Sequence, residues 1–409
     1  MRILSASDAA HEIVTAVAVQ PPLRVPLADA CGHVLAEDVF ASIPLPPWTN
    51  AAMDGYAVRG DDVRGATPDT PVRLRVIEAV RAGSFPGQSL AAGEAARVFT
   101  GAPVPAGADS VVRQEDTDRG MTTVAIHRDR DAGTNVRPSG GDLAKGALAL
   151  GAGAPLGPHQ LAVLAALAVA HPMVHRLPRI AILATGDEIV SIDHPEEVLA
   201  ARQLADVNGP ALAALVHEAG GVSVPLGIAR DDPAALRGRL DASDDFDMLI
   251  TVGGVSVGDH DHVRAVLAAR GARTLFDRVR VRPGGPTVFG LLPDGRPWLG
   301  LPGNPVSAMV TFELFGRPAI RTMGGHRDPL RPRFRAILGA GAKQDATLEQ
   351  FLRCTFSPSD QEGLPVARLT GPQGSGMLMS IVNADGLAII AAGNASVPAG
   401  AMVDALRFG

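Results

Sequence analysis

The chain has 409 residues, more than one hydrophobic core normally serves, and 46% of them are hydrophobic, so we expect several domains. Its formal net charge of −6 argues against the basic surface typical of general nucleic-acid binding, and we expect no nucleic-acid partner. The chain has two cysteines, Cys31 and Cys354, so we expect no disulfide framework and a reducing compartment. No apolar run is long enough to span a bilayer, so we expect a cytoplasmic protein without a membrane partner.

The first part of the chain predicts a helix followed by a β domain. Residues 1–45 begin with a helical pattern that Ser7 or Asp8 could cap, and the pattern breaks at the prolines of residues 44–47. Residues 46–139 alternate short β-like runs with turns, which predicts a small β domain. Residues 140–177 contain a glycine-rich stretch and a helix that we expect to end at His171-Pro172.

Between residues 178 and 326, short aliphatic runs alternate with helix-like segments, which indicates an α/β domain with a parallel sheet. The predicted strands are Ile180–Ala184, Val222–Ile228 and Met248–Val252. The predicted helices are Pro210–Ala219 with Asn208 as N-cap, Pro233–Leu240 with proline at its first position, and Asp261–Arg270. Residues 327–409 have strand-like runs without a long helix signal, so we expect a C-terminal, barrel-like β domain.

Five loops rich in glycine, proline and acids follow or border these runs. They are Thr185–Glu188, Arg230–Pro233, Gly253–Gly258, Arg282–Pro286 and Leu301–Pro305. Ligands of parallel sheets gather outside the carboxyl ends of the strands, so we expect the loops to line one crevice. The Gly253–Gly258 loop precedes a predicted helix, whose first N–H groups favour an anion.

Three acids, Glu188, Asp231 and Asp261, are expected to project into this crevice. Clustered carboxylates repel one another unless a cation such as Mg²⁺ or a bound proton compensates. The glycine loop has neither the lysine of a P-loop nor the spacing of a dinucleotide turn, so on its own it is equally consistent with a plain strand-to-helix turn. Beside the acids, it indicates a metal-assisted reaction at a phosphate or another oxyanion.

Five motifs are spread over nearly the whole chain: Asn50–Ala57 (NAAMDGYA), Thr100–Pro105 (TGAPVP), Thr185–Glu188 (TGDE), Gly253–Gly258 (GGVSVG) and Leu301–Ser307 (LPGNPVS). Together they resemble the molybdopterin molybdenumtransferase family, which includes the E domain of gephyrin. The resemblance implies a Mg²⁺-assisted enzyme that inserts molybdate into adenylylated molybdopterin and releases AMP, the last step of molybdenum cofactor synthesis. It also implies that residues 1–45 and 140–177 form one N-terminal linking domain, and that residues 178–326 bind molybdopterin.

The resemblance further implies the roles of individual residues. Site residues of the first half are Asp54, Thr100 and Asp142, and Glu188, Asp231 and Asp261 are the catalytic acids that hold Mg²⁺. Substrate-binding residues are Gly253, Gly254, Ser256, Gly258, Arg278, Arg282, Pro302, Gly303, Asn304 and Pro305. In the family a second subunit completes the cleft, so we expect a homodimer with a shared site, and transient contacts with other cofactor-synthesis enzymes.

The chain departs from the family in one basic loop. Where the family usually shows K-x-x-x-K-P-G-K-P, this chain has Arg278, Arg282 and Gly285 in place of three lysines. Only Lys145 and Lys343 are lysines, so a general preference for arginine explains the first two replacements but not Gly285. Residues 204–208 (LADVN) also depart from the family, which tends to show tyrosine or arginine before D-S-N or D-T-N, although Asp206 and Asn208 are kept.

Two other functions stay open at this point. One is an adenylyltransferase acting one step earlier, which shares the core of the sheet domain, and the domains on either side argue against it. The other is a non-enzymatic scaffold like the E domain of gephyrin. The sequence does not separate molybdate from tungstate, or a main enzyme from a divergent paralogue.

Overall fold

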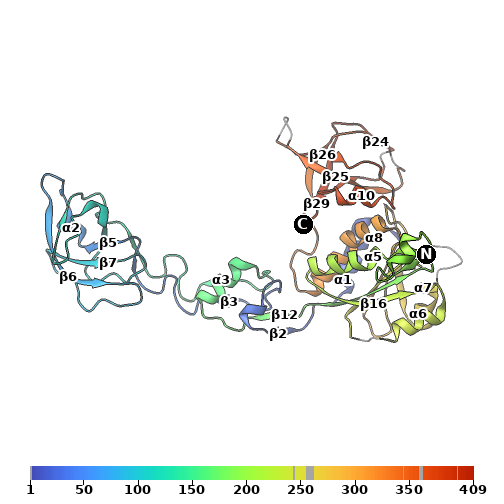
Figure 1. Ribbon diagram of the computed structural model, residues 1–409, viewed down its shortest axis with the longest axis horizontal. Helices are drawn as coiled ribbons and strands as arrows, with labels where there is room; N and C mark the ends of the chain where they lie inside the picture. The colour runs from blue at the N-terminus through green and yellow to red at the C-terminus, as the bar shows by residue number, and fades with distance from the viewer. Residues whose placement is uncertain (1, 243–244, 255–261, 344, 359–362, 394) are drawn as a thin grey trace. The chain divides into compact units, whose positions relative to one another are not determined.

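The chain forms two compact units in the computed structural model (Figure 1). The structure describes residues 2–242, 245–254, 262–343, 345–358, 363–393 and 395–409. The smaller unit comprises Glu37–Ala152 and Pro158–His171, and the larger comprises Met1–Ala36, Gly153–Gly157 and Pro172–Gly409. Of the helices in the described ranges, none is long and apolar enough to cross a membrane.

A five-stranded sheet in the order β8-β5-β7-β6-β9 forms the centre of the smaller unit and confirms the small β domain of the predicted fold class. Its strands are β5 (Gly55–Val58), β6 (Val72–Val80), β7 (Glu94–Val98), β8 (Ser110–Arg113) and β9 (Thr123–Ile126). Side chains of β5 alternate between two cores, since Tyr56 and Val58 pack in one and Ala57 packs in the other. This burial on both faces fixes the segment that follows Asp54.

Shorter elements complete the smaller unit. They are β3 (Val39–Phe40) paired with β11 (Leu148–Leu150), β4 (Asn50–Ala51) paired with β10 (Val136–Arg137), and the helices α2 (Gly60–Val63) and α3 (Pro158–Ala166). The prediction that the last helix ends at His171-Pro172 is wrong. Ala168 has a φ of +59°, a left-handed conformation that a helix interior does not contain, and this ends α3 earlier.

The α/β domain of the larger unit has a six-stranded sheet in the order β16-β13-β17-β22-β21-β18. Its strands are β13 (Arg179–Thr185), β16 (Val222–Ala229), β17 (Met248–Val252), β18 (Arg273–Phe276), β21 (Val288–Leu291) and β22 (Pro297–Leu301). The strands β16, β13, β17 and β22 are parallel to one another, as predicted. At the edge, β21 pairs antiparallel with β22, and β18 pairs antiparallel with β21. The carboxyl ends of the parallel strands therefore meet at one edge.

Helices cover both faces of this sheet. They are α5 (Asn208–Glu218), α6 (Pro233–Leu240), α7 (His262–Ala269), α8 (Pro305–Thr311) and α9 (Arg317–Met323). Ile182 of β13 packs in the same core as Leu212 of α5, while its neighbour Leu183 packs in a second core with Leu236 of α6. A strand buried on both faces is apolar at every position, which explains the continuous aliphatic runs of the sequence.

Two predicted helix caps are wrong. Helix α1 (Ala6–Ala16) is capped by Ser5, whose hydroxyl accepts the N–H of Asp8, and not by Ser7 or Asp8. Helix α5 includes Asn208, so Asn208 is not its N-cap. The carboxylate of Asp206 instead accepts the N–H groups of Asn208 and Gly209 at 3.1 and 2.9 Å, which satisfies the free donors of this helix start.

The C-terminal part confirms the predicted barrel-like β domain. The strands of the barrel are β23 (Phe334–Leu338), β25 (Glu349–Ser357), β26 (Val366–Leu369), β27 (Gly386–Ile390) and β29 (Met402–Arg407), and β24 (Ala342–Lys343) pairs separately with β28 (Ser396–Val397). The barrel strands pair in the closed ring β25-β26-β23-β29-β27-β25, which leaves no edge within the ring. The short strand β20 (Val281–Arg282) of the preceding domain pairs with β25, and α10 (Leu378–Val382) lies between β26 and β27 in the chain.

Candidate active site

A cavity of about 670 Å³ lies at the carboxyl ends of the parallel strands. All five predicted loops contribute residues to it, and four of them supply Thr185, Gly186 and Glu188, then Asp231, then Gly253 and Gly254, then Pro302, Gly303, Asn304 and Pro305. The fifth loop contributes Pro286 here and lines an adjoining cavity of about 290 Å³ with Arg282, Gly284 and Gly285. The two cavities share Pro286, Pro302 and Asn304, so the loops form one continuous site.

Backbone forms the floor of the larger cavity at Gly253 and Gly254. These residues have φ of +87° and +61°, and an added Cβ would lie 2.7 Å from the carbonyl oxygen of Thr185 and 2.8 Å from Cγ2 of Val263, respectively. Both positions therefore require glycine, and both residues line the cavity. Three further predicted residues, Ser256, Gly258 and Asp261, lie outside the described residues.

Two of the three predicted acids line this cavity. Burial raises the pKa of Asp231, and the carboxylates of Asp187 and Glu188 raise it further. The residues that the structure describes contain no group of three or more His, Cys, Asp or Glu side chains placed to hold a metal ion. Mg²⁺ is often held by one or two carboxylates together with substrate phosphates, so Glu188 and Asp231 fit that ion in number and chemistry.

The basic loop brings only one of its two predicted arginines to the site. Arg282 lines the smaller cavity, whereas Arg278 belongs to β19 (Arg278–Val279), pairs with Ile3 of β1 (Ile3–Leu4) and lines neither cavity. The carbonyl oxygen of Gly285 accepts the N–H groups of Val279 and Thr287, each at 2.9 Å. The loop is thus held by its backbone, and Arg282 supplies the positive charge.

The predicted residues of the first half lie in the smaller unit. Thr100 donates its backbone N–H and its hydroxyl to Oδ1 of Asp54, both at 2.8 Å, and these two bonds are the main reason why the pKa of Asp54 is lowered. Asp142 is exposed, and its backbone N–H donates to the carbonyl of Leu45 at 2.9 Å. Asp54 is therefore held as a carboxylate with a fixed orientation.

Comparison with known proteins agrees with this arrangement. Family models match three stretches of the chain: the MoeA N-terminal region (domain I and II) at residues 4–168, the probable molybdopterin binding domain at residues 181–322, and the MoeA C-terminal region (domain IV) at residues 335–408. The molybdopterin molybdenumtransferase 2 of Mycobacterium tuberculosis is 39% identical over 372 residues, which are 90% of each chain. The chain belongs to the molybdopterin molybdenumtransferase family.

Other proteins of the molybdopterin molybdenumtransferase family are also similar to this chain over most of its length. The molybdopterin molybdenumtransferase of a Nostoc species is 37% identical over 389 residues, 94% of this chain and 88% of that one. A crystal structure of the molybdopterin biosynthesis protein moeA from Pyrococcus horikoshii covers 100% of both chains with a TM-score of 0.81 at 27% identity. Another crystal structure, of a molybdopterin biosynthesis moea protein from Pyrococcus horikosii, also covers 100% of both chains, with a TM-score of 0.78 at 31% identity. The family therefore accounts for the complete fold.

Two residues that were not among the predicted site residues, Asp206 and Asn208, also line the larger cavity. Asn208 donates from Nδ2 to the carbonyl of Gly303 at 2.8 Å, and its buried Oδ1 has no partner among the described residues. The bond ties the start of α5 to the loop that forms the far wall. Their signal in the sequence was the D-x-N pattern directly before a predicted helix.

The barrel contributes a further loop that sequence reasoning left out of the site. Gln373, Gly374 and Ser375 line the smaller cavity, and the carbonyl of Ser375 accepts the N–H of Val306 in α8 at 3.1 Å. Arg353 of β25 is fully buried and donates to the carbonyl of Gly374 at 3.0 Å. Burial lowers the pKa of Arg353 to about 10, which still leaves the side chain charged at neutral pH. No periodic pattern marks such a residue.

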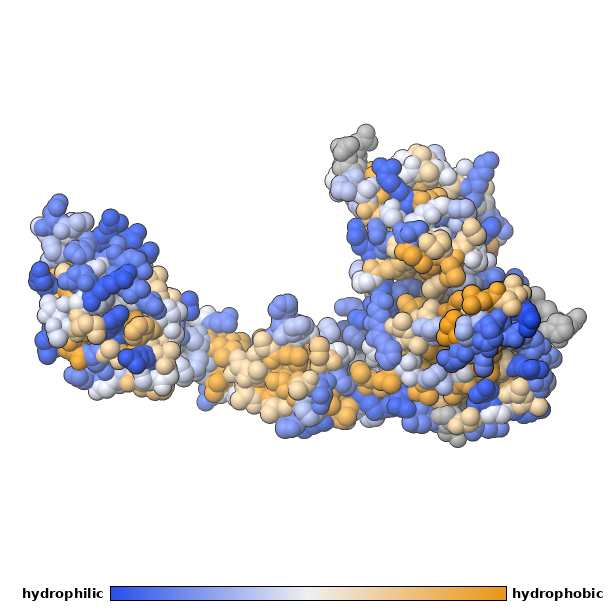
Figure 2. Space-filling view, viewed as in Figure 1, coloured by the Kyte–Doolittle hydropathy of each residue, from blue (hydrophilic) through white to orange (hydrophobic). Residues whose placement is uncertain are grey.

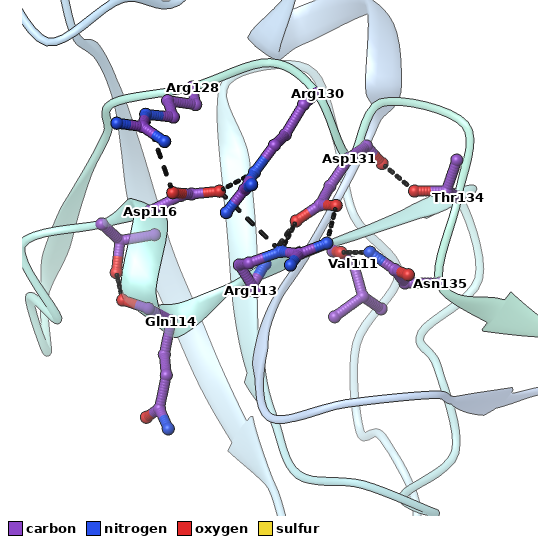
Figure 3. A network of polar contacts seen from close by, with 10 residues as sticks. Val111, Arg113, Gln114, Asp116, Arg128, Arg130, Asp131, Thr134 and Asn135 are labelled. Carbon is purple, nitrogen blue, oxygen red and sulfur yellow. Dashed lines mark hydrogen bonds and ion pairs between the residues drawn. The ribbon is translucent and has the colours of Figure 1, made fainter.

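Figure 3 shows a polar network around Asp116 and Asp131 in the small β domain, and Gln114 links it to the segment that carries Asp54. Gln114 donates its backbone N–H to the carbonyl of Asp54 at 3.1 Å, and its neighbour Arg113 forms a bidentate pair with Asp131 at 2.9 and 2.8 Å. Burial by itself would raise the pKa of Asp131, but the bonds from Arg113 outweigh burial and lower it to about 2. The network thus fixes the edge of the sheet beside Asp54.

Proposed function

We propose that this chain is a molybdopterin molybdenumtransferase, which inserts molybdate into adenylylated molybdopterin and releases AMP. The observation that carries the proposal is the continuous cavity in which the Gly253–Gly254 backbone, the acids Glu188 and Asp231, and the basic loop with Arg282 meet. The relatives that match all three regions of the chain support this function over an adenylyltransferase, which would need only the α/β domain.

Each side of the cavity suits one part of the reaction. Cleavage of a phosphoanhydride builds negative charge on oxygen, which fixed donors and cations stabilise with little reorganisation. The carboxylates of Glu188 and Asp231 would hold Mg²⁺, which supplies Lewis-acid charge to the phosphate oxygens when it is bound. The like charges that raise the pKa of Asp231 are relieved by such a cation. Arg282 in the adjoining cavity is placed to bind an oxyanion such as molybdate.

We propose that the working unit is a homodimer. Phe40 of β3 and Leu148 of β11 are cross-strand partners, yet 56% and 52% of their surfaces are exposed. Figure 2 shows hydrophobic residues over the region of β3 and α3. An apolar surface of this kind is typical of a subunit interface. In the shared site of this proposal, Asp54, Thr100 and Asp142 of one subunit act on substrate that is held in the α/β domain of the other.

Rescue of a cell that lacks its molybdenumtransferase tests the proposed function. Expression of this chain should restore the activity of a molybdenum-dependent enzyme, and the Asp231→Asn variant, produced at the same level, should not. Growth with tungstate in place of molybdate would show which oxyanion is used. A native chain that is folded and produced but gives no rescue would argue against the proposal.

A further inference from the structure

Two aromatic side chains of the smaller unit pair on its surface. The rings of Trp48 and Phe85 lie edge to face, with centroids 5.2 Å apart and an angle of 71° between their planes. Even so, 37% of Trp48 and 67% of Phe85 are exposed to solvent. The other tryptophan of the chain, Trp298, is only 1% exposed, as is usual for a large ring in a core. The exposed part of the pair thus presents aromatic surface to solvent.

Hydrogen bonds place Trp48 between the candidate site residues of this unit. Its indole Nε1 donates to the carbonyl of Gly101 at 3.4 Å, and Gly101 directly follows Thr100, the partner of Asp54. On the other side, the hydroxyl of Thr49 accepts the N–H of Ser139 at 3.2 Å, and Ser139 begins the turn that contains Asp142. Trp48 is therefore bonded beside Thr100, and its neighbour Thr49 is bonded to the turn that contains Asp142.

The chemistry of the substrate fits such a surface. Adenylylated molybdopterin contains two flat heteroaromatic ring systems, a pterin and an adenine, which both stack on aromatic side chains. The carboxylate of Asp54, kept ionised by Thr100, is a nearby acceptor for the amino groups that both rings carry. A surface that stacks a ring beside an acceptor for its edge recognises a purine or a pterin better than a sugar or a phosphate.

We propose that Trp48 and Phe85 form a stacking surface for a planar heteroaromatic ring of the substrate, with Phe85 holding the indole in place. The assignment rests on the proposed function and adds to it a contact that binds substrate without taking part in the chemistry. Stacking of a base on an aromatic side chain changes affinity by roughly 5-fold to 150-fold. Loss of the ring should therefore raise KM and leave kcat nearly unchanged.

Tryptophan emission provides a direct binding test. AMP and a 6-substituted pterin serve as probes for the two rings, and ribose 5-phosphate serves as a probe without a ring. Trp298 lies in a core and responds little, so a change in emission reports on Trp48, and Trp48→Phe should remove it. A change with AMP identifies adenine as the stacked ring, and a change with the pterin identifies the pterin. An emission that neither ring alters, or that ribose 5-phosphate alters equally, would overturn the inference.

Kinetics of AMP release separate this inference from the proposed function. Trp48→Ala should raise KM for adenylylated molybdopterin about tenfold or more, while Trp48→Phe, which keeps a ring, should stay near the native value. Leu199→Ala is the matched control, since Leu199 is 86% exposed and lines neither cavity of the site. A folded Trp48→Ala protein with native KM contradicts the stacking surface and leaves the enzyme assignment intact. A native protein that releases no AMP contradicts the proposed function itself.

Discussion

Thr100 directs both its backbone N–H and its hydroxyl to a single oxygen of Asp54, with both distances at 2.8 Å. Because these bonds favour the carboxylate, the pKa of Asp54 lies below its usual value of 3.8. A lowered pKa means that Asp54 contributes stability above pH 3.8 and that this contribution is lost as the pH falls through the folded-state pKa. The residue is therefore charged over the whole neutral range.

Removal of the Thr100 hydroxyl should raise the pKa of Asp54. Thr100→Ala keeps the backbone bond and loses the side-chain bond, whereas Thr100→Ser keeps both and is the matched control. Carbon-detected NMR titration of the Asp54 carboxyl measures the change. We expect a higher pKa in Thr100→Ala only, and equal values in the two variants would show that the hydroxyl does not hold the carboxylate.

Mixed dimers test whether the site is shared between subunits. Asp54→Asn and Asp231→Asn should each abolish cofactor formation in a homodimer, because each removes a charge from one half of the site. A heterodimer of the two variants contains one site with both changes and one with neither, so it should regain about half of the native activity. Heterodimers that form, as shown by differently tagged subunits, and remain inactive would mean that each site is built from one subunit.

Gly285→Lys should strengthen the binding of molybdate. Gly285 does not have a positive φ, and an added Cβ would make ordinary contacts at 3.5 Å with the carbonyl oxygens of Val279 and Val281, so the fold should tolerate the change. A charge-assisted contact is worth about 1.5 to 3 kcal/mol, or roughly tenfold to a hundredfold in affinity. The molybdate concentration for half-maximal insertion should fall accordingly.

The neighbouring glycine is the control for this substitution. Gly284 has a φ of +101°, and an added Cβ would lie 2.1 Å from Cγ2 of Thr311, so Gly284→Ala should destabilise the domain. An unchanged molybdate requirement in a folded Gly285→Lys protein would mean that Arg282 already fills the role or that the loop does not face the oxyanion. Arg282→Ala separates the two cases, since only the first predicts that it inactivates the enzyme.

Asp131→Asn should destabilise the small β domain. Its carboxylate is buried and accepts three bonds from Arg113, and its pKa of about 2 corresponds to about 2 kcal/mol of stability relative to a pKa of 3.8. This stability is present above pH 3.8 and is lost as the pH falls toward 2. In thermal unfolding at pH 7, Asp131→Asn should have a lower melting temperature than the native protein. Asp61→Asn, which removes an exposed ion pair, should leave the melting temperature nearly unchanged. Equal melting temperatures for the two variants would contradict the role of the network.

Local patterns predicted the elements of the fold that depend on burial. Met248–Val252 is buried at every position and forms a strand with the predicted bounds, because a continuous apolar run between turn residues leaves few alternatives. The N-terminus of α1 was misplaced by two or three residues, since Ser5, Ser7 and Asp8 can all accept a backbone N–H and only the packing of the helix selects among them. The antiparallel edge of the sheet, likewise, depends on pairing between distant segments.

The candidate site was predictable where a residue stands at the end of a strand or in a family motif. Glu188 and Asp231 belong to this group, and the structure places both in one cavity. Arg353 does not belong to this group. It donates a hydrogen bond to a carbonyl 21 residues away in the chain, and no spacing in the sequence predicts that contact. Arg278 was predicted as a site residue from its family position alone. In the structure it pairs with Ile3 and lies outside both cavities.

Release of AMP from adenylylated molybdopterin reports directly on the proposed reaction. Purified protein is mixed with adenylylated molybdopterin and Mg²⁺, and AMP and molybdenum-bearing cofactor are quantified with and without molybdate. We expect the native protein to produce both in equal amounts when molybdate is present, and we expect a folded Asp231→Asn protein to produce neither. A native protein that releases no AMP, or an Asp231→Asn protein that releases it at the native rate, would contradict the account.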